Sequence, residues 1–218
     1  MFDFHTHSLF SDGVLLPMEL IRHAVVKGYK AIALTDHADP SNLEFVIPRI
    51  IQACQTANQH WEITAIPGIE LTHVPPKLIP DLAYRARSLG AKIIVVHGET
   101  IAEPVVPGTN HYALKSDIDI LAHPGLISEE DVRLAAKRHI FLEITSRKGH
   151  SLTNGHVAKL AAKSDASLIL DTDSHEPDDL ISQEQAIKVA IGAGLTESQI
   201  EQIWVNARNL VHRCNKKA

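Results

Sequence analysis

The stretch Ala31-Ile-Ala-Leu-Thr-Asp-His37 decides the expected fold, because a short apolar run leads straight into two residues that can bind metals. The run Ile93-Ile-Val-Val-His97 repeats this pattern. Apolar runs without polar alternation are typical of parallel strands that helices bury on both faces. Similar runs recur along the chain and predict strands at Met1–His5, Ala31–Thr35, Ile63–Ile69, Ile93–His97, Ile118–Ala122, Ile140–Thr145 and Leu168–Asp171.

Amphipathic stretches separate these strands and predict helices at Pro17–Lys27, Leu43–His60, Lys77–Ser88, Glu129–Lys137, Gly155–Lys163, Asp178–Ile191 and Glu197–His212. Capping boxes are expected at Ser41, Ser128 and Thr196, and helix ends at Gly28 and Gly90. The regular alternation of strand and helix predicts an α/β barrel. A doubly wound open sheet is the competing architecture, but no Gly-rich phosphate-binding fingerprint follows the first strand.

The composition narrows the function classes. The 218 residues are expected to form one barrel domain, 1–218, because no linker or low-complexity run divides them. Lys and Arg number 21 against 26 Asp and Glu, and the resulting charge of -5 argues against polynucleotides and anionic membranes as partners. No apolar run approaches the ~18 residues of a membrane span. Two cysteines cannot form a disulfide framework, so we expect a cytoplasmic protein.

Histidines are frequent in this chain, 14 in all, and they fall together with carboxylates at the ends of the expected strands. The carboxyl ends of parallel barrel strands open onto one face, so side chains that are remote in sequence converge there. Each expected strand delivers at least one such residue: His5, His7, Asp36, His37, Glu70, His97, His123, Glu143, Asp173 and His175. The pattern predicts a metal site.

Imidazole and carboxylate groups suit divalent ions such as Zn, Mn or Fe, and no Cys pair stands at the spacing of a structural thiolate site. His5 and His7 are two residues apart, which on a strand places both rings on one face. Asp173 and His175 repeat that spacing. Glu70 could give one oxygen to each of two ions that lie ~3.5–4 Å apart. We therefore expect more than one ion.

A set of short motifs resembles the PHP family, named after polymerase and histidinol phosphatase. The motifs appear in the family's order as His5-Thr-His-Ser-Leu-Phe-Ser-Asp-Gly13, Thr35-Asp-His37, Pro67-Gly-Ile-Glu70, His97, Leu121-Ala-His-Pro-Gly125 and Asp173-Ser-His175. The resemblance implies a distorted seven-stranded TIM-like barrel, (β/α)7, with two or three divalent ions at the strand ends. It also implies phosphoester hydrolysis as the usual activity.

The resemblance also implies which residues bind each ion. Carried over by position, the motifs give a first site of His5, His7, Glu70 and Asp173, a second of Glu70, His97 and His123, and a third of Asp12, His37 and His175. Some members carry His where this chain has Asp12, so the third site departs from their pattern. The alternative reading of Asp12 is a turn residue before Gly13.

Further residues are assigned supporting roles. Asp36 is a candidate to orient His37, and Glu143 a candidate for the surroundings of the ligands or the pocket wall. We expect Glu70, His37 and Asp12 to take part in catalysis, with His37, Asp12 or a water on a third ion giving the leaving alkoxide its proton. The rim is expected to bind substrate through Arg147, Lys148, Thr109, Asn110 and His111, with His73, His150 and His156 as further rim candidates.

The predicted function is metal-dependent hydrolysis of a phosphoester by a water that the metals activate, with a small phosphomonoester favoured by the compact chain. One alternative is a phosphodiesterase or exonuclease acting on short nucleotides, because the motifs do not separate monoesters from diesters. A second is an amidohydrolase-type enzyme, although no Lys stands at a strand end to bridge its metals. A third is a non-catalytic scaffold barrel, but such domains tend to lose ligands that this chain keeps.

Overall fold

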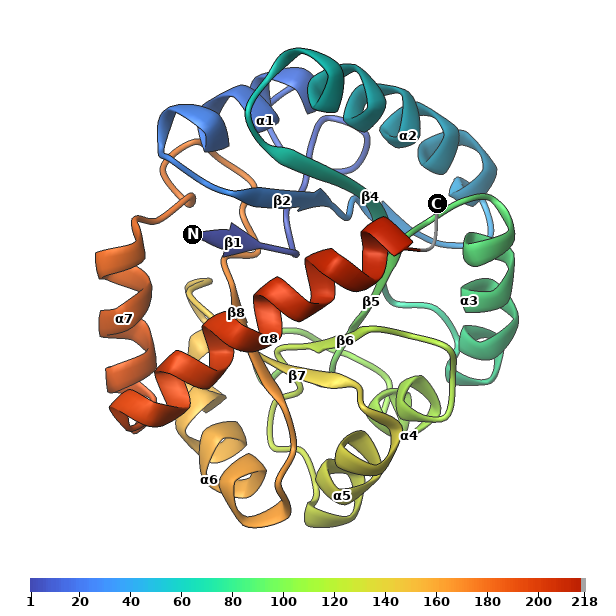
Figure 1. The fold of residues 1–218 in the computed structure, drawn as a ribbon. Helices are drawn as coiled ribbons and strands as arrows, with labels where there is room; N and C mark the ends of the chain where they lie inside the picture. The colour runs from blue at the N-terminus through green and yellow to red at the C-terminus, as the bar shows by residue number, and fades with distance from the viewer. Residues whose placement is uncertain (217–218) are drawn as a thin grey trace.

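The computed structural model describes residues 1–216 and shows a nearly closed barrel of parallel strands (Figure 1). Around the barrel the strands run in the order β1 (Phe2–Asp3), β2 (Ala31–Leu34), β4 (Thr64–Leu71), β5 (Ile93–His97), β6 (Ile120–Ala122), β7 (Phe141–Thr145) and β8 (Leu168–Asp171). A short extra strand, β3 (His37–Ala38), pairs with β4 beyond the end of β2. The predicted seven-stranded barrel is therefore confirmed, and the open sheet is wrong.

The barrel closes at its carboxyl end, between the segments that follow β1 and β8. Thr6 and Ser174 form a parallel bridge there, and the backbone N–H of His7 donates to the carbonyl of Ser174 at 2.8 Å. Closure at this end brings the chain after β1 against the chain after β8. Residues from the two ends of the barrel sequence therefore share one face of the barrel.

Helices surround the barrel, with bounds of α1 (Pro17–Val26), α2 (Leu43–His60), α3 (Ile79–Ser88), α4 (Thr109–Leu114), α5 (Glu129–Arg138), α6 (Asn154–Ser164), α7 (Gln183–Gly192) and α8 (Glu197–Lys216). Two 3-10 turns, η1 (Pro76–Leu78) and η2 (His150–Thr153), precede α3 and α6. The main hydrophobic core lies between strands and helices. None of the helices within residues 1–216 is long and apolar enough to cross a membrane.

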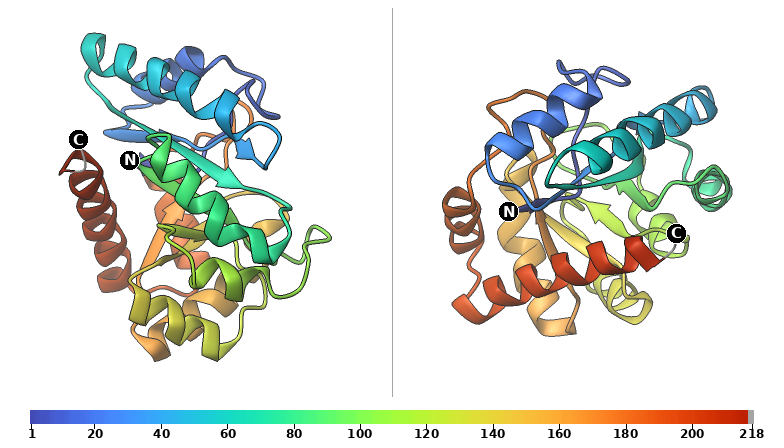
Figure 2. Two further views of the ribbon diagram at one scale, coloured as in Figure 1. Left: turned by 90° about the vertical axis from the view of Figure 1, so that its right-hand side faces the viewer. Right: turned by 45° about the horizontal axis from the view of Figure 1, so that its top comes forward.

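The last helix, α8, covers the amino-terminal end of the barrel (Figures 1 and 2). Its Leu210 and Ala207 pack with Phe4 and other apolar side chains of the barrel interior. Arg213 adds an ion pair, with Nη2 2.8 Å from Oδ1 of Asp119. Because this end is covered, the chemistry is placed at the opposite end, where the strands finish.

The sequence predicted most helix ends, but not the cap of α2 or the start of α7. Ser128 caps α5 as predicted, whereas Ser41 does not cap α2, because its N–H and hydroxyl both bond to Asp39. The helix predicted from Asp178 begins later, at Gln183. The carboxylate of Asp179 accepts hydrogen bonds from the backbone N–H groups of residues 175 and 176 and holds that segment in a turn.

Candidate metal centre

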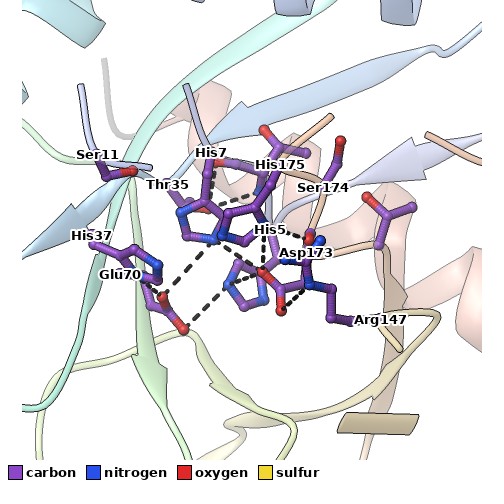
Figure 3. Close-up of polar contacts among 12 residues, drawn as sticks. His5, His7, Ser11, Thr35, His37, Glu70, Arg147, Asp173, Ser174 and His175 are labelled. Atoms are coloured by element: carbon purple, nitrogen blue, oxygen red, sulfur yellow. Dashed lines mark hydrogen bonds and ion pairs between the residues drawn. The ribbon is translucent and has the colours of Figure 1, made fainter. Parts of the chain in front are cut away.

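The expected ligands converge at the carboxyl end of the barrel (Figure 3). Their donor atoms form overlapping groups that each lie within 4.8 Å, and these groups contain every residue of the three sites implied by the resemblance, namely His5, His7, Asp12, His37, Glu70, His97, His123, Asp173 and His175. Three residues outside that set also belong to these groups: His150 joins His97 and His123, and His73 and Glu103 join His97. The structure thus brings together what the sequence spread over the whole barrel.

The innermost group consists of His5, His7, Glu70 and Asp173, all fully or nearly fully buried. Nε2 of His5 lies 3.2 Å from Oε1 of Glu70. Nε2 of His7 lies 3.1 Å from Oδ1 of Asp173. Two ligands on one tetrahedral ion with bonds of about 2.0–2.1 Å lie roughly 3.3 Å apart. The spacing of these donor atoms therefore fits a shared divalent ion.

Glu143 fixes the orientation of this group from the barrel interior. Its Oε1 lies 2.7 Å from Nδ1 of His5, and its Oε2 accepts the backbone N–H of His123 at 2.8 Å. A proton on Nδ1 of His5 leaves the lone pair on Nε2, which faces Glu70 and Asp173. Glu143 thus contacts the ligands His5 and His123 from behind, in the supporting role that the sequence analysis assigned to it.

Asp36 does not orient His37, so that prediction is wrong. Its carboxylate accepts hydrogen bonds from the backbone N–H and the hydroxyl of Ser8 and from the hydroxyl of Ser11. These bonds hold the loop that follows β1. Nδ1 of His37 instead faces Oε2 of Glu70 and Oγ1 of Thr72, each at 2.6 Å.

A second group lies closer to solvent and contains Asp12, His37 and His175. Oδ1 of Asp12 lies 3.3 Å from Nε2 of His37 and 3.2 Å from Nε2 of His175. The loop can bring Asp12 back because it turns at Gly13, where a Cβ would stand 2.3 Å from the carbonyl oxygen of His7. Asp12 is therefore placed among the histidines rather than in an isolated turn.

The third group gathers on the side of β5 and β6, and it differs from the implied second site. Nε2 of His123 lies 3.9 Å from Oε1 of Glu70. His97 instead faces Glu103, with Nε2 3.3 Å from Oε2. The His150 ring stacks on that of His123 with centroids 4.2 Å apart. No sequence pattern pointed to Glu103, because the path of a loop depends on contacts that a local pattern does not encode.

Burial and neighbouring charges shift the pKa values of the histidines in this cluster. Carboxylates, Glu143 foremost, outweigh burial and raise the pKa of His5. Against the effect of burial, Glu70 raises the pKa of His37 to about 10. Burial lowers the pKa of His7 to about 3. A divalent ion must therefore displace protons from some imidazoles, whereas His7 already offers lone pairs.

Buried polar atoms that form no hydrogen bond indicate whether these residues could bind a metal ion. Buried nitrogen and oxygen atoms almost always have hydrogen-bond partners. Within residues 1–216, the buried side-chain atoms without one are concentrated in this centre: Nε2 of His5, both ring nitrogens of His7 and His123, Nδ1 of His97 and Oε1 of Glu70. Such atoms are the donors that divalent ions take, so the residues fit a metal centre.

Backbone strain is also concentrated here. His73, His123 and Asp173 have φ angles of 51°, 25° and 53°, in the left-handed region that side chains with a Cβ rarely adopt. His139 and Asp165 share this conformation, but each ends a helix, where it is common. Strained residues persist where the surrounding structure holds them, often at functional sites.

A pocket of about 370 Å³ opens beside the metal centre, and its lining contains Asp173 but not His5, His7, Glu70 or His123. Its walls include Asp12, His37, His97, Glu103, His150 and Arg147. Arg147 is the only Lys or Arg among the lining residues, and its Nη1 lies 2.9 Å from Oδ2 of Asp179. A pocket of this volume is within the usual range for small-molecule sites.

Among the other predicted rim residues, His73 and His150 line this pocket, whereas Lys148, Thr109, Asn110, His111 and His156 do not. Lys148 is exposed to solvent beyond the rim. Thr109 donates its hydroxyl to the carbonyl of Val106, and Nδ1 of His111 lies 2.7 Å from Asp131. Asn110 is buried and bonds the backbone of two loops. Thr109, Asn110 and His111 lie in α4, a helix that the sequence analysis did not predict.

A parallel α/β barrel with such a cluster at its carboxyl end has the layout of a metal-dependent hydrolase. Comparison with protein families identifies the group more closely, because the PHP domain matches residues 3–149. The chain belongs to the PHP domain family.

Relatives and solved structures agree with this assignment. An uncharacterised protein of Methanocaldococcus jannaschii is 51% identical over 202 residues, covering 92% of this chain and 93% of that protein. A probable phosphatase of Thermoanaerobacter sp. is 28% identical over 227 residues, covering 91% of this chain and 88% of that protein.

Two solved structures share the fold. A chain of archaeal ribonuclease P with mature tRNA has a TM-score of 0.74 at 16% identity, covering 98% of this chain and 91% of that chain. The structures of YwqE from Bacillus subtilis and CpsB from Streptococcus pneumoniae, described as metal-dependent tyrosine phosphatases, give a TM-score of 0.63 at 18% identity. That match covers 98% of this chain and 95% of the other. At these identities the likeness concerns the fold alone.

Proposed function

We propose that this protein hydrolyses a small phosphomonoester with the help of two or three divalent ions. The observation that carries the proposal is the set of buried His and Glu atoms without hydrogen bonds in the metal centre, which lies next to a pocket of about 370 Å³. Membership of the PHP family and a relative named as a probable phosphatase support the coarser statement that this is a metal-dependent phosphatase-like hydrolase.

The proposed ligands are the three sets that the family motifs imply, whose members are spread over the observed groups. A first ion would be held by His5, His7, Glu70 and Asp173, a second by Glu70, His97 and His123, and a third by Asp12, His37 and His175. Because all donors are nitrogen and oxygen atoms, Zn, Mn and Fe are the candidate metals. When bound, such ions neutralise phosphate oxygens and activate water for attack on phosphorus.

Arg147 is proposed to bind the phosphate group of the substrate. Its guanidinium lies in the pocket wall, with Nε 4.0 Å from Oδ2 of Asp173, and the bond to Asp179 holds it in place. A fixed guanidinium loses little side-chain freedom when it binds oxygens, and its planar fork matches two of them. This contact would select the charged group of the substrate.

His37 and Asp12 are proposed to handle protons at the pocket mouth. The pKa of His37 is about 10 in the metal-free protein, because Glu70 and Asp12 outweigh burial. A proton at its Nε2 could pass to a leaving alkoxide when no ion occupies the position beside it. Against the effect of burial, His175 and His37 lower the pKa of Asp12, so its carboxylate stays ionised and stabilises the protonated ring of His37 rather than supplying a proton itself.

Several properties favour a small substrate over the alternatives. A pocket of about 370 Å³ with one Arg in its wall offers little surface for a polynucleotide, and the net charge of -5 adds repulsion. No Lys lines the pocket, which counts against an amidohydrolase-type centre bridged by a modified Lys. The complete set of ligands counts against a non-catalytic scaffold. A short phosphodiester remains the closest alternative.

The proposed location is the cytoplasm. Cys54 and Cys214 are both buried and form no disulfide with each other. Buried thiols that stay reduced are typical of proteins in a reducing compartment.

The decisive test is hydrolysis of a panel of phosphomonoesters and dinucleotides by the protein loaded with Mn, Zn or Fe. Wild type should hydrolyse at least one monoester, and Glu70→Gln should abolish that activity because it removes the shared carboxylate. Glu62→Gln is a matched control, since Glu62 is exposed and lies just before the opposite end of the same strand. A metal-loaded wild type that hydrolyses no phosphoester on the panel would refute the proposal.

A further inference from the structure

The loop after β5 reaches from a fixed base back over the metal centre. At the base, Oε1 of Glu99 accepts the backbone N–H groups of Gly108 and Asn110 at 3.0 and 2.8 Å. Asn110 in turn donates Nδ2 to the carbonyl of Pro124 at 2.9 Å. The contact between these loops is so close that a Cβ on Gly125 would lie 1.8 Å from the carbonyl oxygen of Glu99.

This loop carries Glu103 into a set of imidazoles. Oε2 of Glu103 lies 3.1 Å from Nε2 of His73 and 3.3 Å from Nε2 of His97. Its other oxygen, Oε1, lies 3.4 Å from Nε2 of His150. Both carboxylate oxygens are therefore held, although the Glu103 side chain is 38% exposed.

The spacing of these atoms is that of ligands on one ion. Donor atoms of His73, His97 and Glu103 all lie within 4.8 Å of one another. The two measured His–Glu distances are close to the roughly 3.3 Å expected between ligands of a tetrahedral ion. His73 also holds its ring there with a strained backbone, at a φ of 51°. Strained backbone of this kind clusters at functional sites.

We propose that the ion bound by His97 also takes Glu103 and His73 as ligands, so that metal binding closes the loop after β5 over the centre. This inference rests on the metal centre of the proposed function and not on the reaction. Glu103 and His73 lie outside the ligand sets derived from the family motifs. The loop then becomes part of the metal site, and its position depends on the ion.

The competing explanation is that Glu103 only neutralises protonated histidines in the metal-free protein. The two explanations predict opposite effects of a metal. An ion makes the imidazoles neutral ligands, so a carboxylate that served only as their counter-charge would be released and the loop would loosen. A carboxylate that is itself a ligand would be fixed more firmly, and the loop would tighten.

Hydrogen–deuterium exchange of residues 99–108, with and without Zn²⁺, separates these cases. We expect Zn²⁺ to slow exchange of this loop in wild type and in the control Glu176→Gln, but not in Glu103→Gln. Glu176 is an exposed carboxylate on the same rim, outside the pocket wall. Titration with Co²⁺, followed by its visible absorbance, should show binding about 10- to 100-fold weaker for Glu103→Gln than for the control. His73→Asn should weaken the same binding event.

Faster exchange of the loop on addition of Zn²⁺, or equal Co²⁺ affinity of Glu103→Gln and wild type, would overturn the inference. Both variants change exposed side chains, so the fold should survive them. The readouts are independent of hydrolysis. If wild type showed the expected loop closure but hydrolysed no phosphoester, the proposed function would fail and the ligand role of Glu103 would stand.

Discussion

The Glu143→Gln variant tests whether the metal centre depends on a carboxylate that touches no ion. Glu143 is completely buried, and its two oxygens serve two different partners. One accepts from Nδ1 of His5 at 2.7 Å, and the other from the backbone N–H of His123 at 2.8 Å. Glutamine has nearly the same shape, but one of its ends is a donor. It can therefore satisfy only one of these partners as Glu143 does.

The cost of an unpaired buried donor decides whether the amide oxygen of the glutamine faces His5 or the backbone of His123. If the amide NH₂ faced the backbone N–H of His123, two donors would oppose each other at a buried place, at a cost of about 1–3 kcal/mol. If the NH₂ faced His5, the ring could move its proton from Nδ1 to Nε2 and accept the bond. The second arrangement avoids the unpaired donor, so it should dominate. It also places a proton on the nitrogen that faces Glu70 and Asp173.

The expected result is a metal affinity about 10- to 100-fold lower, with only a small loss of stability in the metal-free protein. Zn²⁺ affinity is measured by competition with a chelating indicator, and stability by urea unfolding in the presence of EDTA. Glu62→Gln again provides the matched control. A Zn²⁺ affinity of Glu143→Gln within about twofold of wild type would show that the orientation of His5 does not matter for binding.

Three further predictions concern other parts of the molecule. Arg147→Met should raise KM with little change in kcat, and so lower kcat/KM roughly ten- to hundredfold. The exposed Lys148→Met is the control and should have wild-type kinetics. An unchanged KM for Arg147→Met would refute the proposed contact between Arg147 and the phosphate. Burial raises the pKa of Asp3 to about 7, so the folded metal-free protein keeps a proton that the unfolded chain releases near pH 4. Its stability should therefore fall from about pH 4 to 7, and Asp3→Asn, which cannot ionise, should gain stability relative to wild type over that range in urea unfolding; a pH-independent difference would contradict this. Asn110→Ala should cost about 1–3 kcal/mol of unfolding free energy, because it leaves buried backbone groups of two loops unpaired, and an unchanged urea midpoint would speak against this clamp.

The sequence alone determined the barrel and the kinds of residue at its open end. Apolar runs such as Ile93–His97 and Leu168–Asp171 form strands with the predicted bounds. A continuous apolar run can bury all of its side chains when it is a parallel strand covered on both faces. Once strands are parallel, the residue at each carboxyl end has a fixed neighbour in the next strand. The register pairs Glu70 with Val95, two residues before His97, and His97 with Ala122, directly before His123, so these three ligands reach the same end of the barrel.

Only the tertiary structure decided how the loops complete this centre. Glu103 and His150 reach the ligands through segments whose paths depend on contacts such as that between Asn110 and Pro124, which no local pattern encodes. For the same reason Thr109 and His111, on the expected rim, turned away from the pocket. The position of a residue at a strand end follows from the hydrogen bonds of the sheet. The position of a loop residue depends on long-range contacts that form only in the folded chain.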